Sequence, residues 1–385
     1  MSRPEGAAAR PPLWAVVAGG GTGGHLYPGL AVAEALVDGG VSAGAIRFVV
    51  SRRPLDAGTV AAAGFAATAI CARGVQRRLT VANLAAGAAL ARGVWQCWGL
   101  LRRSAPRVVL AQGGYVSAAC ALAARLAGVP VVVLEANAVA GAANRLAARW
   151  AVACAAAFPS VALANVVVTG LPVRAAIAGR GPSGGDEAGC ADRRRRARDR
   201  LGIDPGRRLV LVVGGSLGSA RLNAAVSDAC ERLSGRGDIA VRHVLGPAAA
   251  ASEARSGSEA LGYEAVDYEE DMPSALAAAD LVVSRAGGSV VAELAAAGRA
   301  ALLVPLAQAT GGHQSANAAA VADAGGAVVV AEAELDGERL AAEISALLAD
   351  PERLAAMERA AAASAPPQAA ERVADLLRSA AGGTP

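Results

Sequence analysis

"AGGGTGGHLYPGLAVAEAL" (residues 18–36) joins an apolar run at 13–18 to a segment with helical spacing at 26–36. A buried strand, a glycine loop and a helix are the elements that this order predicts. The pattern returns in LVLVVGGSLGSARLNAAV (209–226). Further buried strands are predicted at 47–51, 65–70, 108–111, 131–134, 281–284, 301–305 and 327–330, with helical segments between them. Such alternation predicts right-handed βαβ crossovers and parallel sheets.

Residues 174–208 interrupt this alternation with glycine and charge, so they are predicted to form a linker and the start of a charged, solvated helix. A chain of 385 residues can form two domains that each bury a core. We therefore predict an α/β fold of two facing Rossmann-like domains, with a binding cleft between them at the carboxyl ends of the strands. The expected domains are 1–173 and 174–364. The helix expected within 365–385 is a candidate to pack back on the first domain.

Composition limits the classes of function. Hydrophobic residues make up 54% of the chain and aromatic residues 3%, so the cores are expected to consist of Ala, Val and Leu. All 37 basic residues are arginine, and a net charge of +4 is too small to predict a nucleic-acid partner. The six cysteines form no CxxC pair, which favours reduced thiols over disulfides or zinc. Neither a signal peptide nor a transmembrane span is expected from the apolar stretches.

The glycine loops are candidate phosphate sites, because bare backbone N–H groups and a helix N-terminus can both approach an anion. GGGTGG (19–24) lacks the lysine of a P-loop, and no acidic residue follows the second strand, which disfavours a nicotinamide cofactor. A tight turn without a ligand is the alternative. In SRAGGSVVAEL (284–294), Ser289 is a candidate helix cap. Glu293 there is either an acceptor for two ribose hydroxyls or a solvated helix residue.

Two of the three histidines, His25 and His313, are predicted to lie in loops at strand ends, where ligands bind. An imidazole with a pKa near neutrality can act as general base toward a sugar hydroxyl. A hydrogen-bonded structural histidine is the alternative interpretation of His25.

Six stretches, taken in order, carry a more specific signal. They are GGGTGGHLYPGLAVAEAL (19–36), QGGYVSAACALAARLAGVPVVVLEANAVAGAANRLAAR (112–149), VTGLPVR (168–174), VVGGSLGSARLN (212–223), YEEDMPSALAAADLVVSRAGGSVVAELAAAGRAALLVP (268–305) and GGHQSANA (311–318). Together they closely resemble the MurG family of bacterial N-acetylglucosaminyltransferases. The resemblance runs from about residue 13 to the C-terminus, with the linker unmatched.

The resemblance implies the GT-B glycosyltransferase fold, with the lipid acceptor on the first domain and the UDP-sugar on the second. GlcNAc would move from UDP-GlcNAc to the C4 hydroxyl of MurNAc in undecaprenyl-diphosphate-MurNAc-pentapeptide (lipid I), with inversion. No cofactor or metal is implied, and the chain has no D-x-D motif. His25 would be catalytic. The implied substrate-binding residues are Thr22, Gly23, Gly24, Tyr115, Glu135, Asn137, Arg174, Ser216, Glu269, Arg285, Gly287, Gly288, Ser289, Val290, Val291, Ala292, Glu293, His313, Gln314 and Asn317.

The chain departs from the family's pattern where polar side chains are usual, at Leu134, Ala136, Leu171, Leu217, Gly311 and Gly312. Donor preference and the peptide of the acceptor therefore stay open. Two other functions are kept as alternatives. One is a transferase of the same fold that glycosylates another lipid, such as diacylglycerol. The other is a non-catalytic scaffold that binds cell-wall partners at the membrane.

Residues 71–107 contain seven arginines and no acidic residue. Trp95 and Trp98 are spaced to share one helical face with Leu90, Val94 and Leu101, a pattern typical of a helix in the lipid headgroup region. With Arg102 and Arg103, the two tryptophans are the predicted membrane-binding residues. The resulting prediction is a peripheral protein on the cytoplasmic face of the bacterial membrane, with anionic lipid and cell-wall synthesis proteins as candidate partners. An ordinary core helix with solvated arginines is the alternative.

Overall fold

The structure is a computed structural model that describes residues 12–20, 23–71, 81–177, 187–215, 218–246 and 260–382. Three residues named above, Thr22, Ser216 and Leu217, lie outside this part of the chain, as do residues 72–80 of the arginine-rich stretch.

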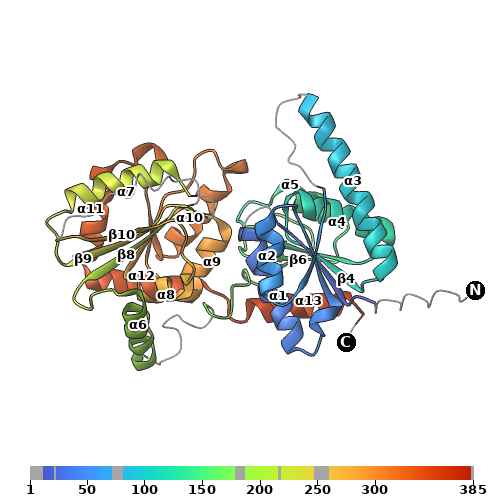
Figure 1. Cartoon of the computed structure of the whole chain (residues 1–385), viewed down its shortest axis with the longest axis horizontal. Coiled ribbons are helices and arrows are strands. Elements are labelled where there is room, and N and C mark those ends of the chain that lie inside the picture. Colours follow the sequence, from blue (N-terminus) through green and yellow to red (C-terminus); the bar gives the residue numbers. More distant parts are fainter. Residues whose placement is uncertain are drawn as a thin grey trace, which may run out of the picture.

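The first domain is a parallel sheet with strand order β3-β2-β1-β4-β5-β6-β7. Its strands are β1 (Ala15–Ala18), β2 (Ile46–Val50), β3 (Ala66–Ala69), β4 (Val108–Ala111), β5 (Val131–Glu135), β6 (Ala153–Ala156) and β7 (Val166–Val168). Its helices are α1 (Gly23–Asp38), α2 (Pro54–Ala62), α3 (Val81–Ser104), α4 (Gly114–Ala127) and α5 (Ala142–Ala147). Figure 1 shows this domain in blue and green.

The second domain is a parallel sheet with strand order β10-β9-β8-β11-β12-β13, shown beside the first in Figure 1. Its strands are β8 (Arg208–Val213), β9 (Ile239–Val244), β10 (Gly262–Val266), β11 (Leu281–Ser284), β12 (Ala301–Leu303) and β13 (Ala327–Val329). Its helices are α6 (Glu187–Leu201), α7 (Ala220–Arg232), α8 (Met272–Ala278), α9 (Gly288–Ala297), α10 (His313–Asp323), α11 (Gly337–Leu348) and α12 (Pro351–Ser364), and α13 (Ala369–Ala380) ends the chain.

The predicted α/β fold of two Rossmann-like domains is confirmed, and all of the strand pairs are parallel. In the first sheet the strand order reverses between β1 and β4, and in the second between β8 and β11. Such reversals open a crevice at the carboxyl ends of the strands, where α/β proteins bind ligands. The predicted glycine loops follow β1, β8 and β11, so all three lie at these two points.

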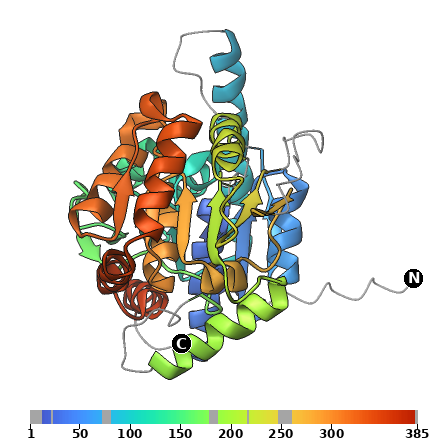
Figure 2. The same ribbon diagram turned by 90° about the vertical axis from the view of Figure 1, so that its left-hand side faces the viewer.

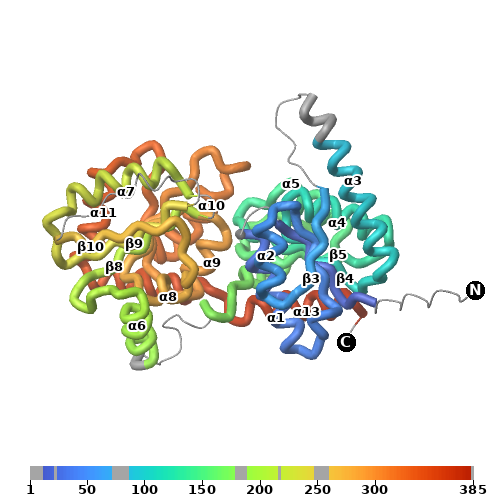
Figure 3. The backbone as a smooth tube through the Cα atoms, in the orientation of Figure 1, coloured from blue at the N-terminus to red at the C-terminus, as the bar shows by residue number. Residues whose placement is uncertain are grey.

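The chain crosses between the domains twice, after β7 and before α13 (Figure 3). The two crossings touch, because a Cβ atom at Gly170 would lie 2.9 Å from Cγ of Pro366. Helix α13 then packs on the first domain, where Val373 and Leu377 are fully buried in the same apolar cluster as Trp14. The domain boundaries at 173 and 364 stay predictions.

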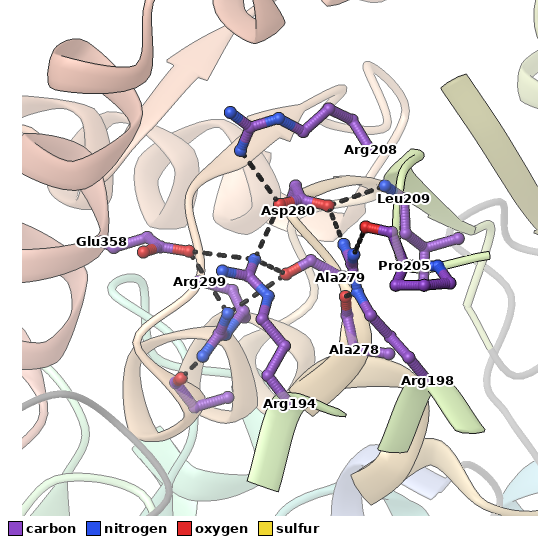
Figure 4. A network of polar contacts seen from close by, with 11 residues as sticks. Arg194, Arg198, Pro205, Arg208, Leu209, Ala278, Ala279, Asp280, Arg299 and Glu358 are labelled. Carbon is purple, nitrogen blue, oxygen red and sulfur yellow. Dashed lines mark hydrogen bonds and ion pairs between the residues drawn. The ribbon is translucent and has the colours of Figure 1, made fainter. Parts of the chain in front are cut away.

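The arginine-rich helix α6 is tied to the second domain, which corrects the prediction of a solvated helix. Arg194 and Arg198 point inward and contact the buried carboxylate of Asp280, with 3.1 Å between Arg194 Nη2 and Asp280 Oδ1. Arg194 also lies 3.7 Å from Oε1 of Glu358, and Arg299 Nη1 lies 3.2 Å from the same atom (Figure 4). Asp280 precedes β11, so this network lies where the strands begin, away from the glycine loops. Figure 2 shows α6 in light green along the lower edge of the domain.

Candidate active site

The glycine loop after β1 keeps α1 close to the loop after β4. A Cβ atom at Gly19 would lie 2.9 Å from Nε2 of Gln112 and 3.1 Å from the carbonyl oxygen of His25. At Gly29, within α1, a Cβ would lie only 2.4 Å from the same Nε2 atom. A side chain at either position would have to displace the buried amide of Gln112, and at position 29 also a methyl group of Val17, so both glycines allow α1 and Gln112 to pack closely. Gly23 begins α1 and places His25 in its first turn.

His25 lies against the loop after β4, where a Cβ atom at Gly113 would be 3.3 Å from His25 Cε1. Burial lowers the pKa of His25 below 6.5, because it disfavours the charged ring. Glu135 and the backbone of Gln112 act in the opposite direction, and His313 lowers the pKa further. The imidazole is therefore neutral near pH 7 and can accept a proton. The start of α10 lies beside the loop after β5, since a Cβ atom at Gly311 would be 4.0 Å from Cγ1 of Val139.

Glu135, at the end of β5, organises the loop that follows it. Its Oε1 accepts hydrogen bonds from the backbone and side-chain nitrogens of Asn137, at 3.0 and 3.1 Å. Its Oε2 accepts from the backbone of Gly141 at 2.9 Å and from Nδ2 of Asn144 at 2.8 Å. With four donors on a fully buried carboxylate, Glu135 holds the loop and keeps a negative charge near His25.

Asn317 of α10 joins this loop to the second domain. Its Oδ1 accepts a hydrogen bond from the backbone N–H of Ala138 at 2.8 Å. Its Nδ2 donates to Oδ1 of Asn137 and to the carbonyl of Ala286, both at 3.0 Å. Asn317 is completely buried, and both atoms of its amide are used. In this structure the side chain is a link between domains, not an exposed ligand contact.

The start of α9 lies against the same loop. A Cβ atom at Gly288 would lie 2.3 Å from the carbonyl oxygen of Ala136, so only glycine permits this approach. The predicted cap at Ser289 is wrong, because α9 begins at Gly288 and Gly287 is its N-cap, without a side-chain cap. The first backbone N–H groups of a helix have no intrahelical acceptor. Those at the start of α9 are therefore suited to bind a phosphate.

Glu293 and Arg174, both predicted to contact the donor, are paired with each other. Nη2 of Arg174 lies 3.5 Å from Oε1 of Glu293, and Cζ of Arg174 lies 4.5 Å from the ring centroid of Tyr27. Burial raises the pKa of Glu293, although Arg174 acts in the opposite direction. The hydroxyl oxygens of Tyr27 and Tyr268 are 3.3 Å apart and connect the two domains a second time.

Two other predicted donor contacts are occupied by protein groups. Arg285 is buried, and its Nη2 atom donates to Oγ of Ser219 at 2.7 Å and to Oε1 of Glu332 at 2.5 Å. The Glu269 side chain is also buried, with Oε2 accepting from Nε of Arg242 at 2.6 Å. Both side chains therefore support the walls of the site. Glu269 was expected to bind substrate, but its carboxylate is engaged by Arg242 in this structure.

At the start of α10, the Nδ1 atom of His313 lies 2.7 Å from the carbonyl oxygen of Thr310. The backbone N–H of Leu306 donates to Oε1 of Gln314 at 2.9 Å. The preceding residues 311 and 312 have φ angles of +69° and +68°, which explains why glycine replaces the family's polar residues there.

The other departures from the family pattern have a packing explanation. Leu134, Ala136 and Leu171 are buried in the apolar cluster of the first domain. Within residues 290–292, Val291 is buried in the core of the second domain, and Ala292 packs against the first. These side chains shape the contact between domains.

Helix α3 does not have the apolar face predicted for it. Leu101 is buried, and Leu90 and Val94 pack against the core of the first domain. Trp95 and Trp98 point the other way, with 71% and 36% of their surface exposed. The prediction of one shared face is wrong, because residues 90, 94 and 101 follow the inward stripe of the helix.

The exposed side of α3 also carries arginine. Cζ of Arg102 lies 5.7 Å from the ring centroid of Trp98, and Arg103 is exposed beside it. None of the helices in the described part of the chain is long and apolar enough to cross a membrane. In the same part, no three His, Cys, Asp or Glu side chains are grouped so that they could hold a metal ion.

Sequence reasoning missed three residues of the site. Gln112 is 3% exposed beneath the glycine loop, and neither polar atom of its amide has a partner within the described ranges. Tyr27 and Tyr268 form the second link between domains. All three residues lie within the six sequence stretches that resemble the MurG family, and this could have identified them as candidates for the site. Tyr115, which was predicted, is 43% exposed in the first turn of α4.

Comparison with known proteins agrees with this geometry. Residues 15–156 match the Glycosyltransferase family 28 N-terminal domain, and residues 209–373 match the C-terminal domain of that family. A relative from Nocardioides sp. is 41% identical over 366 residues, which cover 94% of this chain and 96% of the relative. A relative from Desulforudis audaxviator is 36% identical over 379 residues, covering 95% and 98%. Both are named UDP-N-acetylglucosamine--N-acetylmuramyl-(pentapeptide) pyrophosphoryl-undecaprenol N-acetylglucosamine transferase.

Among solved structures, the crystal structure of Acinetobacter baumannii MurG is similar, with a TM-score of 0.71 and 27% identity. The match covers 96% of this chain and 99% of that one. The predicted GT-B arrangement is thereby confirmed. The chain belongs to glycosyltransferase family 28 and, within it, to the MurG family of N-acetylglucosamine transferases.

Proposed function

We infer that this protein is a transferase that moves GlcNAc from UDP-GlcNAc to lipid I, with the C4 hydroxyl of MurNAc as acceptor. The observation that carries the mechanism is the position of His25. Its neutral imidazole belongs to the first domain, and its pKa is influenced by His313 of the second. His25 lies at the edge of the first sheet where the loop after β5 meets the start of α9, so a base lies on one side of the domain boundary and a helix start on the other, as a two-substrate transfer requires.

We propose a single displacement with inversion. The acceptor oxygen attacks C1 of GlcNAc while the bond from C1 to the UDP oxygen breaks, and the hydroxyl proton moves to His25. The charge of Glu135 stabilises the imidazolium that forms, because it raises the pKa of His25. The N–H groups at the start of α9 face the negative charge that develops on UDP.

Donor binding is proposed to separate the pair of Arg174 and Glu293. The carboxylate of Glu293 would then accept the ribose hydroxyls, and Arg174 would meet the diphosphate. The raised pKa of Glu293 supports this exchange, since it shows that Arg174 does not fully compensate the carboxylate for its burial.

Kinetics of Glu293→Ala test this assignment. The variant loses one or two charge-assisted hydrogen bonds of about 1.5–3 kcal/mol each, so KM for UDP-GlcNAc should rise tenfold or more. Glu352→Gln, at an exposed position of α12, is the matched control. Unchanged affinity for UDP-GlcNAc in Glu293→Ala would remove residues 284–294 from the donor site.

Labelled UDP-GlcNAc offered with lipid I or diacylglycerol separates the enzyme from its alternatives. Turnover with lipid I is expected. Transfer to diacylglycerol alone would indicate the other lipid transferase, and no transfer to either would indicate the scaffold.

We further propose that the exposed tryptophans and arginines of α3 bind the cytoplasmic face of the membrane. Anionic vesicles should pellet the protein at low salt and release it at high salt, because each arginine near the surface contributes about 1 kcal/mol. Replacing Trp95 and Trp98 by serine should weaken binding, whereas Leu55→Ser, at a 73% exposed position of α2, should not. Equal binding to neutral vesicles would contradict this proposal.

A further inference from the structure

A cavity of about 890 Å³ lies between the domains, on the side of the two chain crossings. One wall is formed by α1 of the first domain, and the opposite wall by α9 and α10 of the second. The crossings at 170–175 and 362–371 close it behind. Its volume lies within the range of small-molecule sites, which are frequent at domain interfaces.

The cavity is separate from the proposed reaction centre. His25, Glu293 and His313 do not line it. It does reach the start of α9, because Gly288, Val291 and Ala292 are among its lining residues, but most of its lining lies on α1 around Ala31 and Ala35, on the later turns of α9 and α10, and on the two crossings. A ligand held against α1 and the crossings would lie away from the start of α9, where UDP is proposed to bind.

The lining has a distinct chemistry. Alanine and other small apolar residues dominate, and three carboxylates, those of Glu34, Asp38 and Glu371, lie at its rim. No arginine is among the described residues that line it, although the chain has 37 basic residues, all arginine. Arg174 lies between two lining residues of the crossing but extends to Tyr27 and Glu293.

Two of these carboxylates lie on consecutive turns of α1. Glu34 is followed by Asp38 four residues later, and like charges at this spacing repel each other. The pKa of Glu34 is raised, first by burial and then by Asp38, while Arg174 acts in the opposite direction. The rim therefore favours a cation, and it disfavours both substrates of the transferase, which are anionic diphosphates.

We propose that this cavity is a binding site for a small amphiphilic cation, with an apolar body and one ammonium or guanidinium group. The apolar body lies between α9, α10 and the crossings, and the cationic group lies beside Glu34, Asp38 and Glu371. Such a ligand contacts both domains and both crossings at once, so it fixes the relative position of the domains without entering the substrate sites.

Calorimetric titration with decyltrimethylammonium, below its micelle concentration, tests the proposal on the full chain. One cation per chain is expected to bind, and decyl sulfate, with the same chain length and opposite charge, should bind at least tenfold more weakly. Saturating UDP should change the affinity for the cation by less than twofold. Displacement by UDP would place the probe in the substrate site and overturn the proposal.

Substitutions in the cavity lining show whether decyltrimethylammonium binds there. Glu34→Gln combined with Glu371→Gln should weaken cation binding by about tenfold, the equivalent of about 1.4 kcal/mol. Asp323→Asn, on α10 outside the lining, is the matched control and should bind as the unmodified protein does. Ala320→Phe should fill the cavity and abolish binding, with Ala296→Phe as a second filling variant if the first does not fold.

Three results would overturn the proposal. They are equal binding of decyl sulfate, unchanged binding by a filling variant whose UDP affinity shows it to be folded, and binding of the cation only near its micelle concentration. None of these measurements depends on transferase activity, so the proposal is tested separately from the proposed function.

Discussion

Replacing Asn317 by alanine tests whether this side chain joins the domains or binds substrate. The change removes three hydrogen bonds, to the Ala138 N–H at 2.8 Å and to Asn137 Oδ1 and the Ala286 carbonyl at 3.0 Å. The first two connect the domains. Because Asn317 is completely buried, its former partners lack water as long as the domains stay together.

The magnitude follows from the two bonds that connect the domains, because the bond to the Ala286 carbonyl lies within the second domain and is lost in either arrangement. Each contributes about 0.5–1.5 kcal/mol net, and a buried partner left without a bond costs about 1–3 kcal/mol. Separation of the domains lets water reach the orphaned groups and limits the loss. We therefore expect the joined arrangement to lose about 1–3 kcal/mol, which lowers its population relative to separated domains roughly 5- to 140-fold.

Hydrogen–deuterium exchange and kinetics measure the effect of Asn317→Ala. The amide of Ala138 should exchange faster and kcat should fall, while UDP, which is expected to bind to the second domain, keeps its affinity within about twofold. Asn317→Asp should do no better, because a carboxylate accepts from Ala138 but cannot donate to the two oxygens. Asn223→Ala is the matched control, since this buried amide bonds only within the second domain, to Leu245 and His243.

One pattern of results would refute the reasoning. If exchange across residues 136–141 matches the unmodified protein while UDP-GlcNAc binding weakens, Asn317 is a substrate ligand, as the sequence resemblance implied. The domain contact would then be independent of its amide.

Two further predictions concern His25 and Gln112, the residues that pack beside the glycine loop after β1. His313→Gln should move the acid limb of the pH profile of kcat to higher pH. Protonation of His25 inactivates the base, so this limb follows the pKa of His25, which lies below 6.5. Because His313 lowers that pKa, its removal should raise it. An unmoved limb would mean that His25 is not the titrating base. Gln112→Met should raise the free energy of unfolding by about 1–3 kcal/mol, because it removes two buried polar atoms without described partners. A loss of stability on chemical denaturation would show that the amide has a partner outside the described residues.

Much of the fold could be predicted because buried parallel strands are short apolar runs, and glycine loops show where they end. The predictions at 108–111 and 281–284 match β4 and β11 residue for residue. Strands β6, β7, β9 and β10 were missed, and β7 is only three residues long, with Val167 and Val168 exposed. β6 is alanine-rich, β9 contains Arg242 and His243, and β10 contains Glu264, so none has the expected apolar signal. The pairing of Arg242 with Glu264 and Glu269 explains why a charged strand is tolerated, and it depends on residues 22 and 27 positions away.

The candidate site was harder to predict in detail, because its polar residues have partners far along the chain. Asn137 and Asn317 bond across 180 residues, and Tyr27 and Tyr268 across 241. A single sequence indicates that such residues lie at strand ends, but not whether a ligand or the opposite domain satisfies their hydrogen bonds. The mistaken cap at Ser289 has a local cause, since Gly287 can serve as N-cap without a side chain.

Two polar contacts at the domain boundary, the pair of Arg174 and Glu293 and the amide of Asn317, differ in strength, and this decides which one a donor can open. Nη2 of Arg174 and Oε1 of Glu293 are 3.5 Å apart, and the pair is weak because the raised pKa of Glu293 shows that Arg174 only partly offsets the burial of the carboxylate. The buried amide of Asn317 has three well-formed hydrogen bonds, and the two that connect the domains contribute about 1–3 kcal/mol together. A nucleotide can compensate directly for the loss of the arginine pair, because its diphosphate binds Arg174 and its ribose hydroxyls bind Glu293. It offers nothing to the second, whose partners are backbone groups and Asn137. Donor binding should therefore break the arginine pair and leave the asparagine link intact, so that the loop after β5 stays beside α9 while the sugar is transferred.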